Sequence, residues 1–181
     1  NILLKSNIKV IVFEDQPDQN LSDSVFPNNW ISFHHDGTVV LYPMLAENRR
    51  GERRKDIPLD LQNEHNCLIK RVLDYTDHEQ RGRFLEGTGS VVFDYKNRIA
   101  YANTSPRTDE VVLDKLCRDL GFDKFLFTAV DSNGQDIYHT NVLMCVGDKF
   151  VVICLDTISD IATKEKLLIS FENLHADKWV L

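Results

Sequence analysis

The sequence predicts an α/β fold built of repeated units, in which a two-stranded hairpin is followed by a helix and a closing strand. Three stretches have the pattern of a hairpin, and each leads into a helix-like stretch and a further apolar segment. The spacing between the units is regular, with 58 positions from Phe26 to Phe84 and 54 from Phe84 to Tyr138. A fixed period of this size is the signature of a repeat architecture.

The hairpins are predicted from short apolar runs on either side of a turn. Val, Ile, Phe and Tyr dominate the runs, and Gly, Asp or Asn occupies the turns, which is typical hairpin chemistry. The three predicted hairpins cover residues 24–42, 83–102 and 138–155, with turns at 34–37, 94–97 and 147–148.

The helices and closing strands are clearest in the second and third units. Residues 108–120 have acidic residues at the start and apolar residues at helical spacing, and Gly121 follows as a stop signal. Residues 125–130 then read as a strand. In the third unit we expect a helix over 163–174 and a strand over 178–181.

The beginning of the chain is less regular. Residues 46–67 are strongly charged and contain Pro58, which predicts a loop and an irregular helix before a strand at 72–75. The apolar residues 8–13 read as the closing strand of an earlier unit. A chain that starts and stops on closing strands is expected to be part of a longer polypeptide.

Composition limits the function. The chain has 181 residues, suited to a single domain over 1–181, and its net charge of −7 argues against nucleic acid and anionic membranes as partners. The longest apolar run, residues 150–155, is far too short to cross a membrane. Four cysteines without a Cys-x-x-Cys pair fit neither a zinc ribbon nor a disulfide scaffold, so a reducing cytoplasmic location is expected.

Polar residues gather at the same point of every unit, where the first hairpin strand begins. These residues are Asn28 and Asn29, then Glu86, then His139 and Asn141. Equivalent positions of a repeat converge on one axis or face, so we expect a shared pocket. The alternatives are Asn side chains that cap turns, a solvated Glu86 and a hydrogen-bonded core histidine.

Four motifs together resemble a known family: Phe-Leu-Glu-Gly-Thr-Gly-Ser at 84–90, Tyr-His-Thr-Asn at 138–141, Val-Phe-Pro-Asn-Asn-Trp at 25–30 and Asn-Arg-Arg-Gly-Glu-Arg-Arg at 48–54. They resemble the arginine deiminase-related branch of the guanidino-group-modifying superfamily, and more narrowly its citrulline hydrolase type, often called amidinotransferases. The resemblance implies a pentein fold, a β/α propeller of five units around a pseudo-fivefold axis, here incomplete. It also implies a Cys nucleophile, a His acid/base and an acidic partner.

The resemblance assigns roles to the polar clusters. His139 falls on the catalytic histidine and Glu86 on the acid, while Asn28, Asn29 and Asn141 are expected to bind substrate. Many relatives carry Asp where this chain has Asn29 and Asn141. A carboxylate only accepts hydrogen bonds and suits a guanidinium, whereas an amide also donates and suits a neutral ureido group. The Asn pair therefore favours citrulline over arginine.

A basic segment is the other candidate for substrate binding. Arg49, Arg50, Arg53 and Arg54 form the one dense basic patch of an acidic chain. They are expected either to bind the substrate's α-carboxylate or to form a solvated loop face, and the sequence does not separate these readings. Arg107 is a weaker candidate of the same kind.

The expected nucleophile has no counterpart in this chain. The resemblance places it in the last unit, after a Gly-rich turn, and none of Cys67, Cys117, Cys145 and Cys154 matches that context. Cys145 and Cys154 are expected to be buried thiols in apolar strands. The nucleophilic cysteine is therefore expected to lie outside this chain.

The predicted function is hydrolysis of a C–N bond in a small ureido or guanidino amino acid, preferably citrulline, which yields ornithine. Arginine deiminase or amidinotransferase activity on the same scaffold stays open, as does a non-catalytic binding module, because the pentein fold also serves in a ribosome anti-association factor. No cofactor and no metal is expected, since the consecutive residues 34–36 are poor convergent ligands. Self-association into a homo-oligomer stays open.

Overall fold

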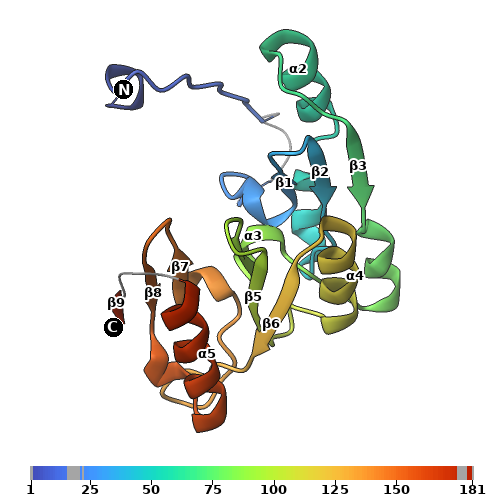
Figure 1. Ribbon diagram of the computed structural model, residues 1–181. Helices are drawn as coiled ribbons and strands as arrows, with labels where there is room; N and C mark the ends of the chain where they lie inside the picture. Colours follow the sequence, from blue (N-terminus) through green and yellow to red (C-terminus); the bar gives the residue numbers. More distant parts are fainter. Residues whose placement is uncertain (1, 16–20, 22, 175–178, 181) are drawn as a thin grey trace.

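The computed structural model describes residues 2–15, 21, 23–174, 179 and 180. It contains three separate three-stranded sheets, one from each unit (Figure 1). In each sheet the first two strands pair antiparallel and the third pairs parallel to the second. The strands are β1 Ile31–Phe33, β2 Thr38–Leu41, β3 Arg71–Asp74, β4 Val91–Asp94, β5 Ile99–Asn103, β6 Asp123–Phe127, β7 Met144–Val146, β8 Val151–Ile153 and β9 Trp179–Val180.

A parallel third strand needs a crossover connection, and the helices supply it. α2 (Asp56–His65), α4 (Glu110–Leu120) and α5 (Ile161–Leu174) lie between the second and third strands of their sheets. This order confirms the predicted repeat of hairpin, helix and closing strand. Near the start of the chain, Ile2–Lys5 form the short helix α1. Two 3₁₀ helices, η3 and η5, cover Thr76–Arg81 and Leu155–Thr157.

α4 shows how local sequence sets the ends of an element. The helix begins one residue after Asp109, whose side chain accepts a hydrogen bond from the Val112 N–H at 3.1 Å. It ends at Gly121, which adopts a positive φ of 69° that a residue with a Cβ disfavours. Its apolar face is buried against the second sheet, as the helical spacing predicted.

The charged segment of the first unit folds into two helices. η2 (Glu47–Glu52) is a 3₁₀ helix, and α2 follows as a regular helix of 10 residues. The expected irregularity is absent because Pro58 lies in the first turn of α2, where a backbone N–H has no intrahelical partner. α2 has no buried residue and lies at the periphery (Figure 1).

A short helical turn precedes the first strand of every hairpin, and the sequence did not predict it. The turns are η1 (Pro27–Asn29), α3 (Gly87–Ser90) and η4 (Thr140–Val142). Because of these turns, the first strands begin later than the apolar runs suggested. α3 contacts both η1 and η4, so the polar positions of the three units meet around α3, between the sheets (Figure 1).

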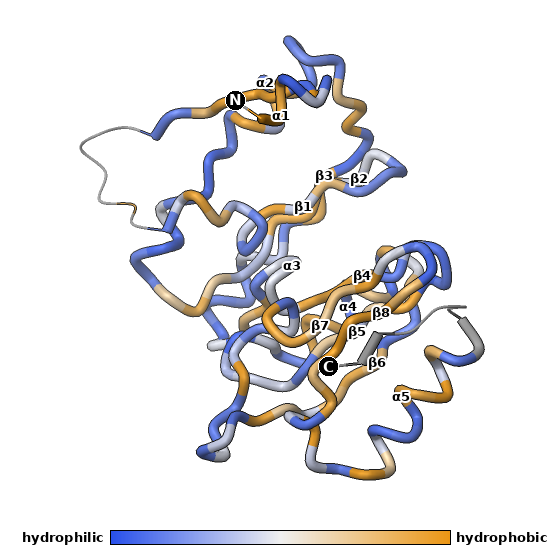
Figure 2. Tube along the Cα trace, turned by 90° about the vertical axis from the view of Figure 1, so that its left-hand side faces the viewer, coloured by the Kyte–Doolittle hydropathy of each residue, from blue (hydrophilic) through white to orange (hydrophobic). Residues whose placement is uncertain are grey.

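The core is shared between neighbouring units. Val40 and Tyr42 of the first unit pack into the cluster of the second sheet and α4, and Tyr101 of the second unit packs into the cluster of the third sheet and α5. Figure 2 shows the hydrophobic residues concentrated in the strands and alternating with hydrophilic residues along α5. These shared clusters fix the units relative to one another.

The prediction of a strand over residues 8–13 is wrong. These residues form an extended connection without strand pairing, and the Val12 side chain is 74% exposed. The physical reason is that the described residues contain no hairpin of an earlier unit for this segment to pair with, and each of the three sheets is closed by a strand of its own unit. Among the described residues, no helix combines the length and the apolar character needed to cross a bilayer.

Candidate active site

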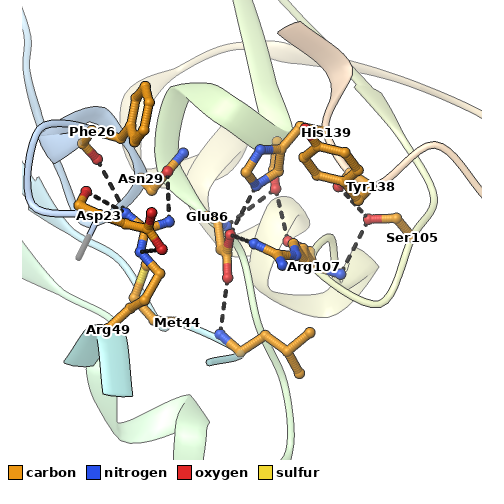
Figure 3. Close-up of polar contacts among 12 residues, drawn as sticks. Asp23, Phe26, Asn29, Met44, Arg49, Glu86, Ser105, Arg107, Tyr138 and His139 are labelled. Atoms are coloured by element: carbon orange, nitrogen blue, oxygen red, sulfur yellow. Dashed lines mark hydrogen bonds and ion pairs between the residues drawn. The ribbon is translucent and has the colours of Figure 1, made fainter. Parts of the chain in front are cut away.

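A buried acid–histidine pair forms the centre of the site. Glu86 lies at the start of α3 and His139 at the start of η4, and Glu86 Oε2 lies 2.8 Å from His139 Nε2 (Figure 3). Both side chains are buried, Glu86 fully. The contact uses Nε2, so Nδ1 is the ring nitrogen left for a reacting molecule.

Glu86 is held in its ionised form. Its Oε1 accepts a hydrogen bond from the Leu45 N–H at 3.1 Å, and its Oε2 also accepts one from Arg107 Nη1 at 3.0 Å. Burial favours the neutral acid, but the hydrogen bond to His139 and the charge of Arg107 outweigh it, and the pKa of Glu86 lies below its ordinary value. A carboxylate at this place stabilises the charge that the imidazole gains when it takes a proton.

The glycines of the Glu-Gly-Thr-Gly motif allow the three turns to approach closely. A Cβ added at Gly87 would lie 2.1 Å from the Asn28 carbonyl oxygen, and the φ of Gly87 is +49°. A Cβ added at Gly89 would lie 2.5 Å from Asn29 Nδ2 and 3.0 Å from the His139 ring. The two glycines therefore leave the space that the Asn29 amide and the His139 imidazole occupy.

Asn29 is the second buried polar group of the site, and Arg49 holds it. Arg49 Nη1 donates to Asn29 Oδ1 at 2.9 Å (Figure 3). Arg49 is also paired with Glu52, which accepts from Nε at 2.9 Å and from Nη2 at 2.8 Å. Burial opposes the charge of Arg49, but Glu52 outweighs this effect and the pKa of Arg49 is raised.

A pocket of about 380 Å³ opens beside these groups. It brings together six residues that the sequence singled out, drawn from all three units. These residues are Asn28, Asn29, Arg49, Arg107, His139 and Asn141. Glu86 lies beneath the wall, behind His139 and Arg107.

The other three arginines of the basic segment lie elsewhere. Arg50 and Arg53 form ion pairs with Glu79, and Arg53 Nη2 lies 3.0 Å from Glu79 Oε2. Arg54 pairs with Asp56 at 2.5 Å and contacts the N-terminal segment, where it donates to the Glu14 carbonyl oxygen at 2.7 Å. Each of these cations thus has an anionic partner within the chain.

Some residues of the pocket wall were not singled out from the sequence. The Tyr138 ring lies 4.9 Å from the His139 ring and 5.3 Å from the Arg107 guanidinium carbon, which closes one side. Glu52, the partner of Arg49, does not line the pocket itself and was missed as well, although its spacing of three residues from Arg49 is a signal for a helical ion pair. Asp23 and Phe26 complete the wall near Arg49.

None of the four cysteines is among the residues that line this pocket in the described part of the chain. Burial raises the pKa of Cys117, in α4, to about 11, so its thiol stays protonated at neutral pH. The expectation that Cys145 and Cys154 are buried is wrong: Cys145 is exposed and Cys154 partly so. β7 is an edge strand of its sheet, and Cys145 points away from the core that Met144 enters.

The arrangement can perform proton transfer at a pocket lined by polar side chains. His139 can take or give a proton at Nδ1 with Glu86 behind it, and Asn29 and Asn141 offer amide groups at the pocket. Within the described residues, no group of three or more His, Cys, Asp or Glu side chains is arranged to hold a metal ion.

Comparison with known proteins identifies the class and then the family. The model of the family described as "N,N dimethylarginine dimethylhydrolase, eukaryotic" matches residues 1–179. This match places the chain in the guanidino-group-modifying superfamily that the four motifs predicted. Within it, the chain belongs to the eukaryotic N,N dimethylarginine dimethylhydrolase family. No curated protein sequence matches the chain.

Solved structures share the fold. The N-terminal domain of ArgZ, an arginine dihydrolase of cyanobacteria, superposes with a TM-score of 0.71 at 18% identity, over 99% of this chain and 60% of that domain. Unliganded AgrE gives 0.69 at 19% identity, over 99% of this chain and 24% of AgrE. A dimethylarginine dimethylaminohydrolase adduct gives 0.57 at 12% identity, over 90% and 57% of the two chains. The chain thus spans less than two thirds of these proteins.

Proposed function

We propose that the full-length protein hydrolyses a C–N bond of a ureido or guanidino amino acid, with citrulline preferred and ornithine as the product. The observation that carries the proposal is the Glu86–His139 contact of 2.8 Å at the wall of a pocket that also presents Asn29. A pure binding module has no need of an ionised acid behind a histidine whose second nitrogen is left for a ligand.

The proposed chemistry is covalent and has two steps. A cysteine thiolate from outside this chain attacks the ureido carbon, and His139, as imidazolium, protonates the departing amine nitrogen. Ornithine leaves, and the carbamoyl group stays on the sulfur. Water, deprotonated by His139, then attacks the carbonyl carbon of this thiocarbamate and releases the thiolate together with carbamate, which decomposes to ammonia and carbon dioxide. Glu86 orients the imidazole and stabilises its charge throughout.

Two comparisons support this route. One ArgZ structure is described as covalently bonded to a reaction intermediate, and ArgZ itself is described as an arginine dihydrolase. The family description names dimethylarginine instead. Citrulline, arginine and dimethylarginine share a planar carbon bonded to nitrogen at the end of an amino-acid side chain, so the same pocket is proposed to admit all three, with citrulline preferred.

The pocket residues suggest how the rest of the substrate is held. We assign the α-carboxylate to Arg107, because its guanidinium lies at the wall and its side chain is 29% exposed. Asn28 and Asn141 are proposed to contact the polar groups of the substrate from the first and third units. Arg50, Arg53 and Arg54 have no part in this proposal, since their partners are Glu79 and Asp56.

The test is to incubate the full-length gene product with citrulline, arginine or dimethylarginine and to assay ornithine, citrulline and ammonia. The proposal predicts ornithine and ammonia from citrulline without an added amine. Citrulline without ornithine, formed with ammonia from arginine or with dimethylamine from dimethylarginine, would replace citrulline hydrolysis with deiminase or dimethylaminohydrolase activity. A requirement for an amine acceptor would indicate a transferase. No turnover of any of the three would contradict an enzymatic function.

Asn29→Asp tests the preference for a neutral ureido group. A carboxylate at this position cannot donate to a ureido oxygen, so citrulline turnover is expected to fall and arginine turnover to rise. Both rates should be measured on the same preparation, with thermal unfolding as a control for folding. Unchanged citrulline turnover without any gain for arginine would contradict the assigned role of Asn29.

A further inference from the structure

The orientation of the Asn29 amide is fixed by its neighbour. Arg49 Nη1 donates to Asn29 Oδ1 at 2.9 Å, and a guanidinium has N–H donors only, so the amide oxygen must face Arg49 (Figure 3). The amide nitrogen then faces the other way, toward Gly89 and the His139 ring. This is the place where a Cβ on Gly89 would lie 2.5 Å from Asn29 Nδ2 and 3.0 Å from the imidazole.

Arg49 is itself held in one position. Glu52 accepts from both Nε and Nη2, and Nη2 also donates to the Asp23 carbonyl oxygen at 3.2 Å. The Arg49 and Glu52 side chains are 7% and 1% exposed. A buried two-pronged ion pair restrains the guanidinium plane, and the carboxylate neutralises its charge beside the pocket.

This arrangement has a chemical consequence for the ligand. With its oxygen turned to Arg49, Asn29 presents an N–H donor to the pocket, and that donor needs an acceptor on the ligand. A ureido group has a carbonyl oxygen to accept it, whereas a guanidinium has donors only. An amide free to rotate would offer its oxygen to a guanidinium equally well.

We propose that Arg49 is a positioning residue for substrate choice. It holds the Asn29 amide with its nitrogen toward the pocket. The amide N–H then donates to a ureido oxygen, and the binding of a guanidinium is disfavoured. This inference rests on the proposed function. It assigns Arg49 to the selection of the reacting group and leaves the α-carboxylate to Arg107.

The test compares kcat/KM for citrulline and for arginine in the full-length protein. Arg49→Met alone leaves Glu52 buried without its cation, so the double variant Arg49→Met/Glu52→Gln is measured beside it. When the Asn29 amide is free to rotate, the ratio of kcat/KM for citrulline to kcat/KM for arginine is expected to fall about tenfold, which corresponds to about 1.4 kcal/mol. Arg98→Met is the matched control, because Arg98 hydrogen-bonds the Leu120 and Gly121 carbonyls at the end of α4; it should leave the ratio unchanged.

A double-mutant cycle separates positioning from a general structural effect. If Arg49 acts through the amide, the change in ratio disappears when the same substitutions are made in an Asn29→Ala background. Where turnover in that background is too slow, the dissociation constants of citrulline and arginine from calorimetry give the same ratio.

The outcomes distinguish this inference from the proposed function. The positioning role alone would be overturned if the wild-type protein turns over citrulline and the Arg49 variants lose kcat/KM for citrulline and for arginine in equal proportion. A change of ratio that persists without Asn29 would also overturn it. A wild-type protein without turnover of either substrate would overturn the proposed function, and this inference with it.

Discussion

Glu86 is the residue on which the polar contacts of the site converge. Its two carboxylate oxygens accept from the backbone of Leu45 and from the side chains of Arg107 and His139, which belong to different segments of the chain. The sequence suggested both Glu86 and His139 because they occupy equivalent places in the repeat. It did not suggest that Arg107 joins them, since 21 positions separate Arg107 from Glu86 and only the folded hairpin brings them together.

Glu86→Gln tests the charge of this carboxylate through the pH dependence of stability. The pKa of Glu86 is depressed in the folded protein, so its ionisation stabilises the fold above the ordinary carboxyl range, and this stabilisation is lost as the pH falls through the folded-state value. At pH 7 we expect the variant to be less stable by about 1–3 kcal/mol, because a charged hydrogen-bond acceptor is lost. Urea unfolding at several pH values should show this difference shrinking as the pH falls below about 4.5. A difference that stays constant would argue against a depressed pKa.

Gly89→Ala tests the close approach of the three turns. The added Cβ would displace the Asn29 amide and the His139 ring, and kcat/KM for citrulline is expected to fall at least about tenfold, or about 1.4 kcal/mol in transition-state binding. Gly51→Ala is the control, because its Cβ would make only an ordinary 3.4 Å contact with the Leu21 side chain. Equal activity of the two variants would contradict the packing described for α3.

At the scale of elements, the hairpins and helices followed from the sequence and the short turns did not. Alternating β-branched residues and glycine stops mark strands and helices locally. η1 has one local signal that was not used, Pro27 at its first position, whereas η4 has none, and both turns pack against α3. The same limit applies to the arginines: sequence spacing did not separate Arg49, whose partner is Glu52, from Arg50 and Arg53, whose partner Glu79 lies in η3.

Leu116→Ala tests the packing of α4 on the second sheet. Leu116 is fully buried in the helix face that the spacing predicted, and its truncation should cost about 2–5 kcal/mol of unfolding free energy. Val111 lies on the same helix with 49% of its surface exposed, so Val111→Ala should change stability by no more than about 0.5 kcal/mol. Denaturant unfolding of both variants measures the contrast, and similar losses would contradict the assigned faces.

At the scale of the molecule, the site exists only where the units meet. Asn29, Glu86 and His139 come from the first, second and third units, and the buried Thr140 beside His139 ties the last two together. Thr140 Oγ1 lies 2.6 Å from the Ser90 carbonyl oxygen and accepts from the Asn103 N–H at 2.9 Å. The repeat made this convergence predictable, while the hydrogen bonds between the units depend on the packed core and were not.

The proposed role of His139 is tested most directly by the rate of ornithine release from citrulline by the full-length protein and by its His139→Gln variant. If His139 protonates the departing amine and activates water, the variant should retain its fold by circular dichroism and lose about 10²- to 10⁴-fold in kcat. Equal rates in the two proteins, or no ornithine from the wild type, would contradict the account.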